Sequence, residues 1–239
     1  MTTEEKDIYV ETRMGQMVSL LDPKPETIKL SDIAASLANI NRFNGQCHTQ
    51  HNVADHSIAV AIKAKQLGFC ASSQLTALLH DAHEAYTGDI TWPMKKLLDV
   101  YCPGVVAALQ AKFDLVIWDA LCPGLMFYAG PEIRQIDTDL VHAEAYKLMH
   151  PDGVGRSWKI PVAGVPPLAF SMRSPEAAEA KFITVFNRLL VEAKAEQADC
   201  QGDAVSEIAE DDDDPSMVPG RPELTGEADD EPGEYSEAE

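Results

Sequence analysis

Residues 78–89 read LLHDAHEAYTGD and gather four metal-binding or proton-transferring side chains within five positions, directly behind an apolar run. Residues three and four apart share one face of a helix, so His80, His83 and Glu84 are expected to point the same way, with Asp81 about 100° round. An imidazole and a carboxylate suit Mn, Fe, Co, Ni or Zn better than Ca, because nitrogen ligands favour the borderline transition metals. The stretch therefore predicts a helix that carries part of a metal site.

Two adjacent ligands do not complete a metal site, and further candidates occur on two other predicted helices. Upstream, His56 lies in NVADHS, which opens an apolar helical stretch. Downstream, IDTDL offers Asp137 and Asp139, which are two apart and so point to nearly opposite faces of a helix. Only one of these two aspartates can face the ion, and the residues alone leave both open.

The ordered set His56, His80-Asp81 and Asp137 resembles the signature of the HD-domain phosphohydrolases, H…HD…D. The segments NVADHSIAVA and HDAHEAYTGDITWP, with the spacing from Arg42 to His56, more closely resemble bacterial HD-domain 5′-deoxynucleotidases. The stretch that begins LLDPKPETIKLSDIAASLANINRFNG is similar to phage-encoded relatives, which include dATP triphosphohydrolases. The resemblance covers residues 8–190 and implies an all-α HD-domain helical bundle.

The same resemblance implies a ligand set. It selects Asp137 over Asp139 and places His56, His80, Asp81 and Asp137 around one divalent transition metal, which is Mn, Co, Zn, Fe or Ni, with Mg also allowed. Such an ion lowers the pKa of water and neutralises phosphoryl charge, which suits the hydrolysis of phosphate esters.

Catalytic and substrate-binding residues are expected around that ion. Glu84, one turn from His80, is the expected general acid or base. The planar guanidinium of Arg42 suits bidentate contact with phosphate oxygens, and with Asp81 it completes the catalytic set. His83 has no single expected role, since a phosphate contact, a second metal and an outward-pointing side chain all stay open. The other expected substrate contacts are Phe43, Asp89, Thr91 and Lys95.

Hydrophobic periodicity predicts a mostly α-helical single domain over residues 1–200. Residues 8–20 alternate weakly around Arg13-Met14-Gly15, which indicates a short N-terminal β-hairpin. Ser31 is the expected N-cap of a helix that ends near Asn41. The remaining predicted helices cover residues 53–66, 72–86, 91–98, 103–118, 132–149 and 174–195, and a loop is expected over 151–167.

Residues 201–239 carry 15 acidic residues against one basic residue, Arg221, so −14 of the formal net charge of −20 falls on this tail. Such a segment buries too little apolar surface to offset its chain entropy, and a disordered acidic C-terminal tail is expected. The body is only mildly acidic, which disfavours binding to duplex nucleic acid.

The cysteines and the first residues of the chain indicate the cellular compartment of the protein. The five cysteines are odd in number and lack a C-x-x-C pair, which fits reduced thiols in a cytoplasm. A charged start and the lack of an apolar run of ~20 residues predict neither a signal peptide nor a membrane span. We expect a cytoplasmic protein, in the host cytoplasm if phage-encoded. Because the relatives are dimers or larger rings, we also expect a homo-oligomer.

Three functions follow from these residues. The first is a 5′-deoxynucleotidase that releases phosphate from deoxynucleoside monophosphates. The second is a deoxynucleoside triphosphohydrolase, with dATP as a candidate substrate, which would need the same metal site and release triphosphate. The third is a regulatory module that binds a nucleotide without hydrolysis, and the filled position of Glu84 argues against it.

Overall fold

The computed structural model describes residues 8–128, 130–150 and 170–209, with side chains up to residue 199. Within these residues the chain is almost entirely helical, apart from one small sheet at the start, which confirms the predicted fold class. The elements, in chain order, are β1 (Tyr9–Glu11), β2 (Met17–Ser19), η1 (Pro25–Thr27), α1 (Leu30–Asn39), η2 (Arg42–Gly45), α2 (Val53–Gln66), α3 (Ala71–Leu79), α4 (Glu84–Thr87), α5 (Trp92–Tyr101), α6 (Val105–Leu121), α7 (Pro131–Leu148) and α9 (Pro175–Ala209).

The predicted hairpin is present and is anchored on the first helix. β1 and β2 pair antiparallel, with Val10 opposite Val18, and Gly15 in the connecting turn has a φ of 78°. Asp32 of α1 accepts hydrogen bonds from the Thr12 hydroxyl, at 2.9 Å, and from the Met14 amide, at 3.0 Å. The helix begins at Leu30, so the expected N-cap Ser31 lies inside its first turn. The hairpin is therefore tied to α1 by one buried carboxylate.

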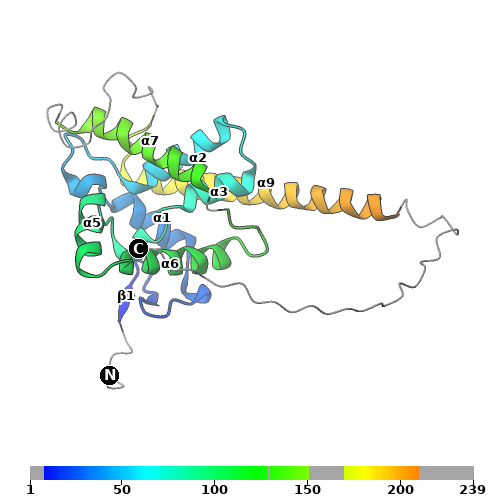
Figure 1. Cartoon of the computed structure of the whole chain (residues 1–239), viewed down its shortest axis with the longest axis horizontal. Helices are drawn as coiled ribbons and strands as arrows, with labels where there is room; N and C mark the ends of the chain where they lie inside the picture. Colours follow the sequence, from blue (N-terminus) through cyan, green and yellow to red (C-terminus); the bar gives the residue numbers. More distant parts are fainter. Residues whose placement is uncertain (1–7, 129, 151–169, 210–239) are drawn as a thin grey trace, which may run out of the picture. The chain divides into compact units, whose positions relative to one another are not determined.

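Helix α2 is the centre of the fold. It packs against α1, α3 and α7 (Figure 1), and nearly every residue of its first two turns is buried. Several of these residues are alanine, whose small side chain lets neighbouring helices approach closely. Asn52 caps the helix, since its side chain accepts a 2.8 Å hydrogen bond from the Asp55 amide. His56 follows within the first turns and is held in the interior.

Aspartate 55 connects the start of α2 to the start of α9. It accepts hydrogen bonds from the main-chain amide and the guanidinium of Arg173, just before Pro175 begins the helix as the sequence predicts. The apolar face of α9 adds Phe182 and Leu189 to the core cluster. This link brings two segments more than a hundred residues apart onto the same core.

The helix expected over residues 72–86 is interrupted, which corrects the sequence interpretation. Regular α-helix ends at Leu79, and a turn leads into the short α4. Within the turn the Ala82 amide donates to the Leu79 carbonyl, and the Glu84 amide donates to the Asp81 carbonyl, both three residues back. We expected residues 80, 83 and 84 to share one face of a regular α-helix. The turn is wound more tightly than an α-helix, so that expectation does not apply to it.

The other predicted helices are present, α2 with the predicted ends and the others with ends shifted. The last one continues to Ala209 and so includes residues that the sequence assigned to the disordered tail. Residues 210–239 and the predicted loop over 151–167 lie outside the described residues, so the disorder of the tail stays a prediction. Among the described helices no single one is long and apolar enough to cross a membrane; α5 and α6 meet that test only together, across a bend of 118°.

Candidate metal centre

Side chains from three separate segments, α2, the turn after α3 and α7, converge at the interrupted helix. His56 Nε2 lies 2.9 Å from Asp137 Oδ1 and 3.9 Å from Asp81 Oδ2. His80 Nε2 lies 3.1 Å from Asp81 Oδ2 and 3.7 Å from Asp137 Oδ1. Two ligand atoms that bind one ion at its usual bond lengths are about 3–4 Å apart. His56, His80 and Asp81 each place one ligand atom within 4.8 Å of the others, and Asp137 lies close to both imidazoles, so the four expected ligands gather at one place.

Hydrogen bonds to the far ring nitrogens aim both imidazoles. His80 Nδ1 lies 2.9 Å from the Ala77 carbonyl, and His56 Nδ1 lies 2.8 Å from Glu144 Oε1. Because these oxygens only accept, Nδ1 carries the hydrogen and Nε2 can present a lone pair. His80 Nε2 is buried and faces the Asp81 carboxylate at 3.1 Å, but within the described part of the chain it makes no hydrogen bond of regular geometry, as expected of a ligand atom. The donor set therefore fits a divalent transition metal.

The expected ligands differ in solvent exposure, which shows from which side the site can be reached. The exposed fraction of the side chain is 0% for His56, 15% for Asp81 and 33% for Asp137. The site is therefore closed on the α2 side and open beside α7.

The ionisation states of His80 and Asp81 follow from their burial and from the charges beside them. Burial opposes a charged imidazole, but Asp81 and Asp137 outweigh it and raise the pKa of His80 well above its usual range. Burial likewise opposes an ionised Asp81, and His80 nevertheless holds the pKa of that carboxyl below its usual range. Protons on the imidazoles therefore stand where a cation would bind, so metal binding releases protons.

Glu144 of α7 is a central residue that the sequence interpretation missed. Its carboxylate is fully buried and accepts a 2.8 Å hydrogen bond from Arg42 Nε, besides the bond to His56 Nδ1. His51 Nε2 lies 3.0 Å away. Burial would raise the pKa of Glu144, but the charges of Arg42 and His56 hold it well below the usual range. Glu144 lies seven residues after Asp137, and that two-turn spacing was the only signal that could have identified it.

Glu84 lies beside the four ligands, in a dry environment. The residue is 3% exposed, and its Oε2 has no hydrogen-bond partner among the described residues. Burial, reinforced by the negative charges of Asp81 and Asp89, raises its pKa to about 10. In the metal-free protein Glu84 is therefore a protonated carboxylic acid at neutral pH, which suits a general acid.

Arg42 and Phe43 occupy a strained loop before α2. Phe43 and Asn44 have φ values of 55° and 52°, in the left-handed region that non-glycine residues seldom adopt. The Arg42 guanidinium lies 5.5 Å from the centre of the Phe43 ring, and its NH1 is 3.7 Å from Asp81 Oδ2. Arg42 thus faces the expected metal ligands, while Phe43 is half-buried at the rim.

The other expected substrate contacts lie at the start of α5. Asp89 is half-buried, and burial raises its pKa against the opposing charges of Arg42 and Lys95. Lys95 is half-buried and also acts on the charge of Glu84. Thr91 precedes the helix and makes no side-chain cap. Asp89 and Lys95 are therefore close enough to the site to act on its charges, and for Thr91 no contact with it is seen.

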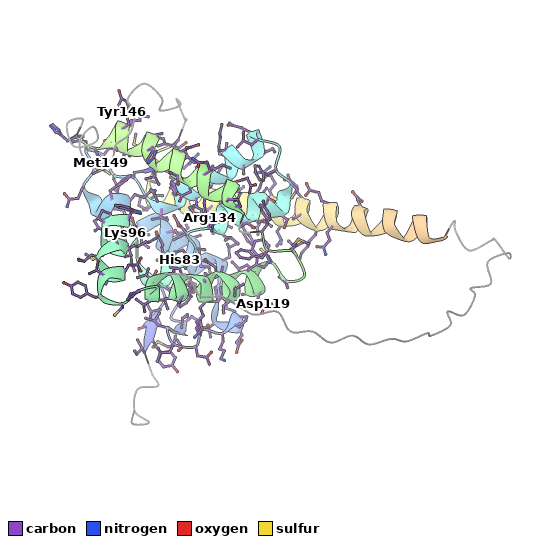
Figure 2. All side chains as sticks on the ribbon, in the orientation of Figure 1. His83, Lys96, Asp119, Arg134, Tyr146 and Met149 are labelled. Carbon is purple, nitrogen blue, oxygen red and sulfur yellow. The ribbon has the colours of Figure 1, made fainter. Side chains whose placement is uncertain are left out.

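The two residues left open by the sequence have definite positions. Asp139 accepts a 2.8 Å hydrogen bond from Gln135 Nε2, one turn earlier on α7, and does not join the other carboxylates. His83 is buried near α6 (Figure 2), where its Nδ1 lies 2.8 Å from Asp114 Oδ1. An outward-pointing His83 is therefore wrong.

A cavity of about 200 Å³ opens beside the metal ligands. His80 and Asp137 form one wall, and Asp114 and Arg134 add two charges of opposite sign. Its apolar walls come from Leu79, Ile117, Trp118, Phe127 and Ile133. Apolar walls with a few polar groups are the usual lining of a small-molecule site.

Replacing Asp137 with asparagine is expected to weaken Mn²⁺ binding by at least about 100-fold, more than the loss of an outer residue that only orients a ligand. The matched change Asp139→Asn is expected to leave binding unchanged, because the side-chain partner of Asp139 among the described residues is Gln135 and not a metal ligand. Isothermal titration of the metal-free proteins with Mn²⁺ measures both. Equal losses in the two variants would refute the choice of Asp137 as ligand.

Replacing Glu144 with glutamine is expected to act on both stability and metal binding. Buried Arg42 loses its counter-charge, which costs about 3–5 kcal/mol, and His56 loses its orienting acceptor, which weakens metal affinity about 10–100-fold. Urea unfolding and Mn²⁺ titration report the two effects. The control is Glu192→Gln, which breaks an exposed pair with Arg188 and should cost less than about 1 kcal/mol. If Glu144→Gln behaves like the control, the buried network has no such role.

Comparison with known proteins agrees with this geometry. Residues 29–99, which carry Arg42, His56, His80, Asp81 and Glu84, match the family model for YfbR-like 5′-deoxynucleotidases. The chain is 31% identical to the uncharacterized protein YfdR of Escherichia coli K12 over 145 residues, which is 61% of this chain and 75% of that protein. It is 40% identical to an uncharacterized protein of Rhodobacter capsulatus over 85 residues, 34% of this chain and 43% of that protein. The chain belongs to the YfbR-like 5′-deoxynucleotidase family of the HD-domain superfamily.

Proposed function

We propose that this protein is a metal-dependent phosphohydrolase of deoxynucleotides, and that its substrates are deoxynucleoside 5′-monophosphates. The single observation that supports it most is the convergence of His56, His80, Asp81 and Asp137, with the buried acid Glu84 beside them. The family of 5′-deoxynucleotidases to which the chain belongs supports the choice of substrate class.

Each group has a task in the hydrolysis. A bound divalent ion supplies charge neutralisation at the phosphoryl oxygens and a lowered pKa for the attacking water. Arg42, held by Glu144, binds the remaining phosphoryl charge without moving. As water attacks phosphorus and the P–O5′ bond breaks, Glu84 gives its proton to the departing 5′ oxygen. The products are inorganic phosphate and a deoxynucleoside.

The nucleoside is placed in the cavity beside His80 and Asp137. Its apolar walls suit a base and a deoxyribose, and the open side of the metal centre faces the same helix, α7. Asp89 and Lys95 at the start of α5 are the proposed sugar and phosphate contacts. We further propose that the protein works as a homo-oligomer, as its resemblance to the HD-domain phosphohydrolases implies.

Product analysis tests the proposal. The purified protein, supplied with Mn²⁺ or Co²⁺, is incubated separately with dAMP and with dATP, and the products are resolved by anion-exchange chromatography. Phosphate released from dAMP, and lost in Asp81→Asn, is the expected result. Triphosphate released from dATP, with dAMP untouched, would move the protein to the triphosphohydrolases. A bound but intact nucleotide in both reactions would favour a regulatory module.

A further inference from the structure

His83 is a buried imidazole that the four-ligand centre does not use. It is 4% exposed, and its Nδ1 lies 2.8 Å from the Asp114 carboxylate of α6. Because a carboxylate only accepts, Nδ1 carries the hydrogen, and the neutral ring presents a lone pair at Nε2. That Nε2 is buried and has no hydrogen-bond partner among the described residues. A carboxylate that aims an imidazole in this way is the usual support of a metal-binding histidine.

Two carboxylates stand next to this imidazole. Asp81, His83 and Glu84 each place one potential ligand atom within 4.8 Å of the others. Glu84 is 3% exposed, and its Oε2 is likewise buried without a partner. An unsatisfied buried polar atom costs about 1–3 kcal/mol, so two of them on neighbouring residues need an explanation. A cation between them would satisfy both at once.

This group is distinct from the centre already described. The other described group with ligand atoms within 4.8 Å of one another is His56, His80 and Asp81, so only Asp81 is common to the two groups. A carboxylate has two oxygens and can bind one ion through each, as in two-metal hydrolases, where the ions lie about 3.5–4 Å apart. Asp81 is therefore placed to bridge two ions.

We propose that Asp81, His83 and Glu84 form a second divalent-cation site, with Asp114 as the residue that positions His83. One nitrogen and two carboxylate ligands select Mn²⁺, Co²⁺ or Zn²⁺ over Ca²⁺. A cation there would neutralise additional phosphoryl charge beside the first ion, and it would ionise Glu84, since a metal-bound carboxylate carries no proton. The protein with a single ion bound is therefore the form in which Glu84 donates its proton to the departing 5′ oxygen. The proposal requires the metal-binding centre but not the identity of the nucleotide.

Metal counting on the full-length protein tests the second site. The protein is stripped with a chelator, and Mn²⁺ binding is measured by isothermal titration and by low-temperature electron paramagnetic resonance. We expect two Mn²⁺ per chain and a spin-coupled spectrum, because the shared Asp81 carboxylate links the ions. His83→Ala is expected to bind one Mn²⁺ and to show an uncoupled spectrum. Asp114→Asn is expected to keep both sites, with the weaker one reduced about 10–100-fold.

Control variants and outcomes keep the two proposals apart. His48→Ala removes an exposed imidazole and should retain two Mn²⁺, and His83→Gln replaces His83→Ala if the latter shows no cooperative melting. One Mn²⁺ per wild-type chain, or two in the His83 variants, would overturn the second site. If one Mn²⁺ suffices for dAMP hydrolysis, the proposed function stands without it. If two ions bind and no nucleotide is cleaved, the second site stands and the proposed function fails.

Discussion

Asp81→Asn is expected to reduce nucleotide hydrolysis on the order of 10³-fold or more, about 4 kcal/mol in activation free energy. The reason lies in the number of partners that one carboxylate serves. Asp81 Oδ2 lies 3.1 Å from His80 Nε2, 3.9 Å from His56 Nε2 and 3.7 Å from Arg42 NH1. Asparagine keeps the shape of the side chain but removes the charge that a cation needs. Initial rates of phosphate release, measured at saturating Mn²⁺, give the change.

The effect of Asp81→Asn must be separated from damage to the fold. Asp119→Asn is the matched control, because Asp119 is exposed on α6 (Figure 2) and should leave hydrolysis unchanged. Far-UV circular dichroism of both variants should match the wild type. Full activity in Asp81→Asn would mean that hydrolysis takes place elsewhere in the molecule.

Glu84→Gln is expected to lower kcat by about 10²–10⁴-fold, the range for loss of a general acid or base. Glutamine fills the same space and can still hydrogen-bond, but it cannot give up a proton to the departing oxygen. A substrate with a better leaving group, such as a p-nitrophenyl phosphate ester, needs less protonation and should lose less activity. An equal loss on both substrates would show that Glu84 is not the general acid.

The same substitution has an opposite effect on stability. In the metal-free protein the pKa of Glu84 is raised to about 10, from an ordinary 4.5, chiefly by burial. Between these values the folded chain keeps the proton and the unfolded chain releases it, so wild-type stability falls by up to about 1.4 kcal/mol per pH unit as pH rises. Glutamine does not titrate. Glu84→Gln should therefore be the more stable protein at pH 8, with a difference that shrinks towards pH 5.

Urea unfolding of the chelator-treated proteins at pH 5, 6.5 and 8 measures this difference. A gap that grows with pH by at least about 1 kcal/mol in total is the expected result. A gap independent of pH would mean that Glu84 is ionised in the folded protein. Activity and stability thus change in opposite directions, as expected of a residue kept for chemistry rather than for packing.

Local signals in the sequence were sufficient for most of the helical framework. Asn52 before an apolar periodic stretch marked the start of α2, and Ser174-Pro175 marked the start of α9. The break after Leu79 was not predicted, because LLHDAHEAY contains no glycine or proline and continues the helical pattern. That break depends on interactions with distant segments, which a local pattern does not contain.

The four candidate metal ligands were identified by the order of their residue types, and in the structure their side chains lie close together. Glu144 was missed because a lone glutamate on a polar stretch of helix is ordinarily a surface residue. Its burial depends on Arg42 and His56, about a hundred residues earlier in the chain. Asp114, the partner of His83, was missed for the same reason, because the two residues lie 31 positions apart in the chain and meet only in the folded protein.

The position of the His56 ring depends on the helical register of α7, because two carboxylates of α7 contact its two nitrogens. Asp137 and Glu144 hold opposite nitrogens of one imidazole, at 2.9 and 2.8 Å. They are seven residues apart, two turns of helix, so both face α2 only if every residue between them is helical. A single inserted residue would turn one carboxylate about 100° away, and the imidazole would then keep only one of these two contacts. The segment between them therefore tolerates substitutions on its outer face but neither insertions nor deletions.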